Sequence, residues 1–196
     1  MHLAADAFAS EPGSWADPAL VAPLLAPGVS ADTARYLLTS PRLGARVSRY
    51  LADRLGHGDG TTLDPTDLAL ACADVGTLRD VATQAGAVWH ARRVCALVRG
   101  ADIAELCDQL GDTVRQSALR HSALAPEDDG GLNDDLAADI VRDGSGCMAA
   151  WIAALPDWAS ARMRLKWPDD TPPPTGARGQ AAAIIVRILA AETRAA

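Results

Sequence analysis

The sequence predicts an all-α protein, an irregular bundle of short antiparallel helices, and three observations support this fold class. Alanine, the strongest helix former, accounts for 41 of the 196 residues, whereas valine and isoleucine, which favour strands, together number 17. Pairs of a capping residue followed by proline recur along the chain. Between these pairs, apolar residues repeat at intervals of three and four, which is the spacing of amphipathic helices.

The first third of the chain is punctuated by proline and glycine. In residues 1–30 this composition leaves room for at most one short helix, beginning at the Asp-Pro pair 17–18. The Ser-Pro pair 40–41 predicts the start of a second helix, whose apolar positions continue to Gly56. The glycine-rich loop that follows is expected to connect this helix to the next.

The spacing of apolar residues predicts nearly continuous helix in the middle of the chain, from Asp64-Pro65 to about Leu124. Three glycines interrupt the pattern where a C-cap would let the chain turn into the next helix: Gly76, Gly100 and Gly111. Another helix is expected from about Asn133. Short turns between helices predict antiparallel neighbours.

Near the C-terminus, apolar and basic residues alternate over residues 161–167, a period of two that predicts a short extended segment. The expected organisation therefore has four parts: a Pro/Gly-rich N-terminal segment at 1–30, a helical domain at 31–168, a Pro-rich linker at 169–179, and a C-terminal amphipathic helix at 180–196 that packs on the domain.

Charge and hydropathy exclude several classes of function. A formal net charge of −7 argues against a nucleic-acid binder, which needs a basic face. The most apolar run, residues 181–191, is 11 residues long and contains Arg187, too short for direct membrane insertion. We expect a cytoplasmic protein whose cysteines stay reduced and unpaired, since none forms a CxxC pair: Cys72, Cys95, Cys107 and Cys147.

No catalytic, cofactor-binding or metal-binding pattern emerges, so we expect a protein without enzymatic activity. His57, His90 and His121 belong to no recognisable triad or zinc motif. The carboxylates between Glu127 and Asp135 lack the spacing of a calcium-binding loop, and negative charge there suits the start of a helix. A small helical enzyme or ligand-binding protein that uses one of these histidines remains the alternative.

Tryptophan is unusually frequent near the C-terminus. Three of the five tryptophans fall within residues 151–167, and two of them flank a cationic stretch. Tryptophan with arginine is typical of protein–protein hot spots, which predicts a partner interface at Trp158, Arg162, Arg164, Lys166 and Trp167. In an extended segment the three cations would form an outward row, compensated either by an acidic partner or locally by Asp169 and Asp170.

Several blocks carry a family resemblance. They are, in order, ARRVCALV at 91–98, the helix through 103–110, ALRH at 118–121, GCMAAWIAALP at 146–156 and ARMRLKWP at 161–168. In content, order and spacing they resemble the SctK family of type III secretion proteins (YscK, PscK and OrgA-like) over residues 63–168. The acidic stretch APEDDGG at 125–131 departs from the apolar, Trp-containing connection of relatives.

This resemblance implies a helical, non-enzymatic accessory protein of the cytoplasmic sorting platform of the injectisome. It implies SctQ pods and the inner-membrane ring protein SctD as partners, beside SctL and the ATPase SctN, and a place peripheral to the inner-membrane base of the apparatus. A type III secretion chaperone is a further alternative, although such chaperones usually show a more regular alternation of strands and helices.

Overall fold

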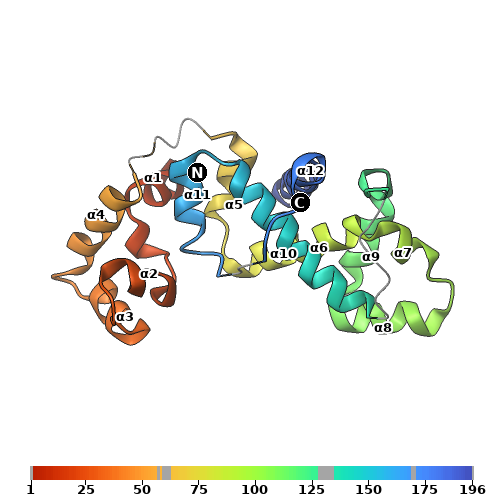
Figure 1. The fold of residues 1–196 in the computed structure, drawn as a ribbon, viewed down its shortest axis with the longest axis horizontal. Helices are drawn as coiled ribbons and strands as arrows, with labels where there is room; N and C mark the ends of the chain where they lie inside the picture. The colour runs from red at the N-terminus through yellow and green to blue at the C-terminus, as the bar shows by residue number, and fades with distance from the viewer. Residues whose placement is uncertain (1, 57, 59–62, 128–134, 169–170, 196) are drawn as a thin grey trace. The chain divides into compact units, whose positions relative to one another are not determined.

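The all-α prediction is confirmed. A computed structural model of the chain describes residues 2–56, 58, 63–127, 135–168 and 171–195. These residues form twelve α-helices and two short 3-10 helices, and no strand occurs among them (Figure 1). Most of the helices are only two or three turns long, as the frequent capping residues and glycines predict.

The chain forms two compact units, each built from two separate stretches of sequence. Unit 1 comprises Met1–Val75 and Ile152–Pro168, and unit 2 comprises Gly76–Trp151 and Asp169–Ala196. Residues 31–168, expected as one helical domain, are thus distributed over both units. Residues 1–30 belong to unit 1 and residues 180–196 to unit 2.

Unit 1 contains a series of short helices joined by tight turns. Its elements are α1 (His2–Ser10), the 3-10 helix η1 (Pro12–Ser14), α2 (Pro18–Leu25), α3 (Ala31–Thr39), α4 (Gly44–Arg54), α5 (Pro65–Cys72) and α11 (Asp157–Met163). Helix α3 lies against α2 and α4, and α4 also contacts η1 (Figure 1). Ala16, Val21, Leu51 and Leu165 form a buried apolar cluster in this unit.

The expectation of at most one helix before residue 30 is wrong, since both α1 and α2 lie there. Phe8 is 2% exposed, and its ring lies 5.2 Å from that of Trp15 and 6.0 Å from that of Trp158. This burial gives α1 a packing partner contributed by residues distant in sequence, which the local proline and glycine pattern cannot reveal. Most helical stability in proteins comes from such packing.

Both Asp-Pro pairs begin helices as predicted. The Asp17 carboxylate accepts a hydrogen bond from Ala19 N at 2.8 Å at the start of α2, and Asp64 accepts one from Thr66 N at 2.8 Å at the start of α5. After Ser40-Pro41 the chain first makes a turn, and α4 begins at Gly44.

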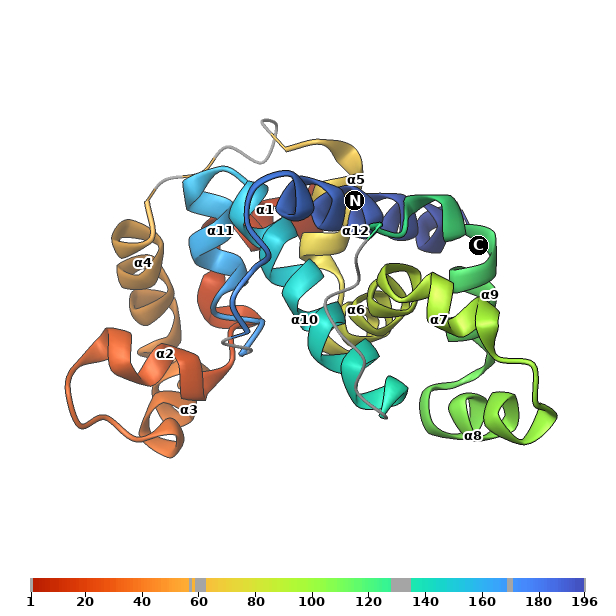
Figure 2. The same cartoon turned by 45° about the vertical axis from the view of Figure 1, so that its right-hand side comes forward.

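Unit 2 contains most of the long helices α6 and α10, the long C-terminal helix α12, and several short helices. Its elements are α6 (Val75–Trp89), α7 (Ala91–Ala96), α8 (Gly100–Leu110), α9 (Asp112–Arg120), the 3-10 helix η3 (Ser122–Leu124), α10 (Leu136–Ala154) and α12 (Gly176–Ala195). Figure 2 shows α7, α8 and α9 as successive short helices, and α9 contacts both α7 and α8. The core between α6–α9 and α10 includes Val94, Leu106, Val114 and Ile140.

The C-terminal helix α12 begins at Gly176, four residues before its expected start. Its buried positions include Ile185, Val186 and Leu189, whereas Ile184, expected on the apolar face, is 49% exposed. Within the described residues, no helix is both long enough and apolar enough to cross a membrane.

Candidate functional site

The segment expected to be extended is helical. Helix α11 covers Asp157–Met163, and a further turn follows, closed by hydrogen bonds from Arg164 N to Ser160 O at 3.1 Å and from Trp167 N to Met163 O at 2.8 Å. The prediction of a strand-like conformation at residues 161–167 is therefore wrong. Pro156 precedes this helix and Asp157 lies in its first turn. Both are signals of a helix start, and here they outweigh the alternation of apolar and basic residues.

Arg162 is buried, with 1% of its surface exposed. Its guanidinium donates to Ala9 O from Nε at 3.1 Å and from Nη2 at 2.7 Å. Its Nη1 donates to Gly56 O at 2.9 Å and to Trp158 O at 3.1 Å, and the group lies 5.3 Å from the Trp158 ring. Burial lowers the pKa of Arg162. The side chain thus joins α11 to the ends of α1 and α4 through neutral carbonyls.

Lys166 is also buried, with 6% of its surface exposed. Its Nζ donates to Ala71 O at 3.0 Å and lies 5.6 Å from the Trp15 ring. Burial lowers the pKa of Lys166, and the nearby Cys72 and Asp74 oppose that shift. Like Arg162, this cation stabilises the packing of unit 1.

The expected outward row of three cations is therefore wrong, because only Arg164 is exposed. Trp158 is half-buried, and Trp167 is 8% exposed. A helical backbone distributes these residues around an axis, so that two cations and the apolar side chains face the interior. Arg162 and Lys166 thus have structural roles within unit 1, while the partner interface expected at these five residues stays a prediction.

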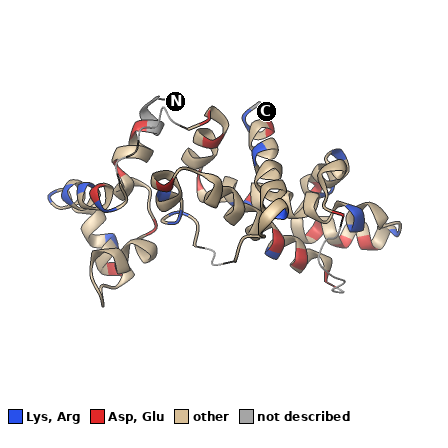
Figure 3. Cartoon of the chain, turned by 45° about the horizontal axis from the view of Figure 1, so that its top comes forward, with Lys and Arg blue, Asp and Glu red and all other residues tan. Residues whose placement is uncertain are grey.

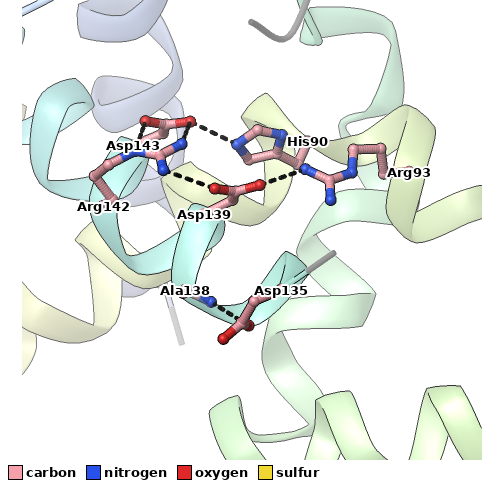
Figure 4. Close-up of polar contacts among 7 residues, drawn as sticks. All are labelled: His90, Arg93, Asp135, Ala138, Asp139, Arg142 and Asp143. Carbon is pink, nitrogen blue, oxygen red and sulfur yellow. Dashed lines mark hydrogen bonds and ion pairs between the residues drawn. The ribbon is translucent and has the colours of Figure 1, made fainter. Parts of the chain in front are cut away.

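A network of charged residues joins α10 to the end of α6 and to α7 in unit 2 (Figure 4). His90, 1% exposed, places Nε2 2.8 Å from Asp143 Oδ2. Arg93 Nη1 lies 2.7 Å from Asp139 Oδ2, and Arg142 Nη1 lies 2.7 Å from Asp139 Oδ1. Arg142 also donates to both oxygens of Asp143, at 2.9 and 3.0 Å.

The network alternates positive and negative groups, so each carboxylate has at least one arginine partner. Hydrogen bonds with Asp143 and Asp139 raise the pKa of Arg142. Asp139 is 1% exposed. Its arginine partners offset the free-energy cost of burying a carboxylate charge. This arrangement fixes the relative positions of helices, and His90, one of the three histidines considered above, belongs to it.

The other histidines and the acidic residues considered in the sequence analysis do not belong to this network. His57 and Asp128–Asp134 lie outside the described residues. Asp135 accepts a hydrogen bond from Ala138 N at 2.9 Å at the start of α10, as expected for negative charge at a helix N-terminus. His121 Nε2 lies 3.2 Å from Glu192 Oε1 of α12. Within the described residues, no group of three or more His, Cys, Asp or Glu side chains is arranged to hold a metal ion.

Sequence reasoning missed a groove in unit 1. It has a volume of about 710 Å³ and is lined by the end of α1, by η1, by the end of α3 and by α4. Arg49 and Asp53 of α4 line it, as does the buried Arg162. The sequence does contain one sign of a distinct surface in this region, a local excess of positive charge. Residues 31–56 contain five arginines and two aspartates, whereas the whole chain has a net charge of −7. Figure 3 shows the Lys and Arg positions in blue along the chain.

The fold and these contacts define an all-α protein in which buried arginine, lysine and histidine side chains tie helices together. Over 170 residues the chain is 30% identical to the nodulation protein NolU of Rhizobium fredii, covering 81% of this chain and 73% of that protein. NolU of Sinorhizobium fredii (strain NBRC 101917 / NGR234) matches to the same extent. The chain belongs to the NolU family. No protein-family model matches it, and no solved structure does.

Proposed function

We propose that this protein is a non-enzymatic cytoplasmic adaptor of a type III secretion apparatus. In this role it links SctQ-type pod proteins, with SctL and the ATPase SctN, to the cytoplasmic domain of the SctD-type ring protein. The observation that carries the proposal is the set of SctK-like blocks within a chain of the NolU family. The relatives are named for nodulation, and a host-directed secretion apparatus is compatible with that name.

The roles of residues in these blocks support an adaptor. Arg93 of the block at 91–98 contacts Asp139, and Arg162 of the block at 161–168 holds three backbone carbonyls. These side chains join helices that are far apart in sequence. Two helical units, each with its own surface, suit a protein whose task is to connect others.

The test combines deletion with co-purification. We expect deletion of the gene to abolish secretion of all substrates, and a plasmid copy to restore it. A tagged full-length protein should co-purify with the SctQ-type protein and with the SctD-type cytoplasmic domain. Unchanged secretion together with no binding to either partner would contradict the proposal.

The same experiment separates the alternatives. A secretion chaperone would co-purify with one secreted substrate, and its deletion would affect that substrate alone. The groove of about 710 Å³ in unit 1 favours a ligand-binding protein as the second candidate, because its volume is in the range of small-molecule sites. In that case secretion would be unaffected and a small molecule would remain bound after purification.

A further inference from the structure

Three arginines form an exposed row at α4, and we infer that this row and the adjacent groove of unit 1 bind an acidic segment of a partner protein. Arg42 lies in the turn before α4, and Arg46 and Arg49 follow on the helix. We call these three residues the arginine row. The inference rests on the proposed adaptor function and names the chemistry of one of its contacts.

The arginine row lacks internal compensation. Arg46 and Arg49 are three residues apart on α4, which places their side chains on the same side of the helix, and Arg42 lies in the turn that leads into it. All three residues are exposed. Across the described residues, no ion pair joins any of them to a carboxylate. By contrast, the neighbouring Arg35 is paired with Asp32 at 2.6 Å, and Arg54 Nη1 donates to Tyr50 Oη at 3.0 Å.

The free protein incurs an electrostatic cost from this arrangement. Like charges three or four residues apart destabilise a helix. Arg46 lies in the first turn of α4, which contains no acidic residue, and a cation there opposes the positive end of the helix dipole. An anionic ligand would relieve both effects, whereas solvent and salt only screen them.

The groove lies next to the arginine row, so that a concave surface adjoins the three cations. Arg49 belongs to both, and Ala45 and Pro41 line the groove beside it. Arg162, 1% exposed and hydrogen-bonded only to neutral carbonyls among the described residues, adds a buried positive charge to the lining. Leu38 and Ala52 provide apolar lining.

The lining is mixed, because Glu11 and Asp53 also belong to it. These two carboxylates balance Arg49 and Arg162 within the lining, so the positive surplus comes from Arg42 and Arg46 next to the groove. The rest of the lining consists of small, hydroxyl-bearing and apolar side chains. This pattern suits a peptide whose carboxylates meet the arginines and whose apolar side chains enter the groove. Arginine binds carboxylates through paired, charge-assisted hydrogen bonds.

The same observations argue against nucleic acid or a membrane surface as the ligand of the arginine row. Nucleic-acid affinity depends on many phosphate contacts, and a chain of net charge −7 repels a continuous phosphate surface. A membrane surface is flat and cannot use a concave lining. A folded protein surface or peptide with a few carboxylates can approach one local row without meeting the acidic remainder of the chain.

The test places a photo-crosslinking amino acid at Ala45, which is exposed and lines the groove, in the full-length protein in its native cells. Mass spectrometry then identifies the crosslinked segment. We expect a protein segment with several Asp or Glu residues next to the crosslink. The triple variant Arg42→Glu, Arg46→Glu, Arg49→Glu should reduce crosslinking at least tenfold.

A matched control reverses three exposed arginines outside unit 1 with the same change in net charge: Arg79→Glu, Arg99→Glu and Arg194→Glu. This control should crosslink like the wild type, and circular dichroism should show that both triple variants remain folded. Reversing the acidic residues of the captured segment to Lys should restore crosslinking to the arginine-reversed variant.

Capture of nucleic acid, of lipid, of a second copy of this chain or of a segment without acidic residues would overturn the inference, as would no capture. Wild-type crosslinking by the arginine-reversed variant would also overturn it. The outcome is separable from the proposed function. An acidic partner outside the secretion apparatus would contradict the adaptor proposal alone. Binding of SctQ and SctD by the wild type, with no acidic segment captured at Ala45, would contradict this inference alone.

Discussion

Gly86 in α6 and Gly144 in α10 each lie against the backbone of the other's helix. A Cβ added at Gly86 would overlap the carbonyl oxygen of Ile140 and lie 2.9 Å from Gly144 N. A Cβ added at Gly144 would overlap the carbonyl oxygen of Ala82 and lie 3.3 Å from Gly86 N. This close approach of the two backbones brings the acidic residues of α10 within reach of His90 and Arg93.

We therefore expect Gly86→Ala and Gly144→Ala each to lower the free energy of unfolding by about 1–3 kcal/mol, the usual cost of overpacking. The obstructing atoms belong to helix backbone and cannot rotate away. Urea denaturation followed by circular dichroism measures the change. Gly100→Ala is the matched control, since an added Cβ there meets nothing within 4 Å, and it should leave stability unchanged or slightly raised.

The glycines also show which part of the fold could be predicted from sequence. Gly111 ends α8 with a φ of 89°, and Gly56 follows α4 with a φ of 84°, as their expected roles at helix ends require. Gly76 and Gly100 instead lie in the first turns of α6 and α8. Helix class was predictable from composition and spacing, whereas close helix crossings depend on contacts between residues far apart in sequence.

Asp139 connects two arginines in the interior of unit 2, and its loss should be costly. We expect Asp139→Asn to lower the free energy of unfolding by about 1.5–3 kcal/mol, because the charge-assisted hydrogen bonds of this buried carboxylate to Arg93 and Arg142 are weakened. The exposed pair of Asp32 and Arg35 is the control, with side chains 88% and 60% exposed. Asp32→Asn should change stability by about 1 kcal/mol or less. Equal effects of the two substitutions would contradict a structural role for the network.

The candidate interface at residues 158–167 shows why site prediction was harder than fold prediction. Tryptophan and arginine there were correctly recognised as unusual, but their partners lie far away along the chain. Arg162 contacts the carbonyl of Ala9, 153 residues earlier, and Lys166 contacts that of Ala71, 95 residues earlier. Charge alone suggested exposure, because buried cations are rare unless such acceptors are present.

Arg162 and Arg164 offer a direct comparison of a buried and an exposed arginine on one turn. Arg162→Met should lower the free energy of unfolding by about 3 kcal/mol, because three backbone carbonyls lose a charged donor. Arg164→Met should change it by about 0.5 kcal/mol or less. Thermal denaturation of the full chain distinguishes them. Should both variants melt with the wild type, Arg162 would have no structural role.

The four cysteines should differ in reactivity. Burial raises the pKa of Cys147 to about 12, and burial also raises those of Cys72 and Cys107. Cys95 is exposed. Alkylation by iodoacetamide at pH 8, followed by mass spectrometry, should modify Cys95 first and Cys147 only on unfolding. A reductant should leave the melting temperature unchanged, and a clear fall would reveal a stabilising disulfide.

Glu192 of α12 gives the protein a stability contribution that depends on pH. Its carboxylate lies 3.2 Å from His121 Nε2 and 3.2 Å from Arg120 Nη1, both at the end of α9. The hydrogen bond with His121, with a further contribution from Arg120, lowers the pKa of Glu192 in the folded state. An acid with a lowered pKa in the folded state contributes stability that is complete above its unfolded pKa of about 4.3 and is lost as pH falls through the lower folded value.

Glu192→Gln should therefore destabilise the protein at pH 7 and have progressively less effect below about pH 4. Because the Glu192 side chain is 40% exposed, the difference at pH 7 should be about 1 kcal/mol or less. Urea denaturation at pH values from 7 to 3 measures it. In a background carrying Arg120→Gln and His121→Gln, the same substitution should show no such pH dependence, since the partners that lower the pKa are gone. A difference that persists unchanged to pH 3, or that survives in this background, would assign the effect to another interaction of α12.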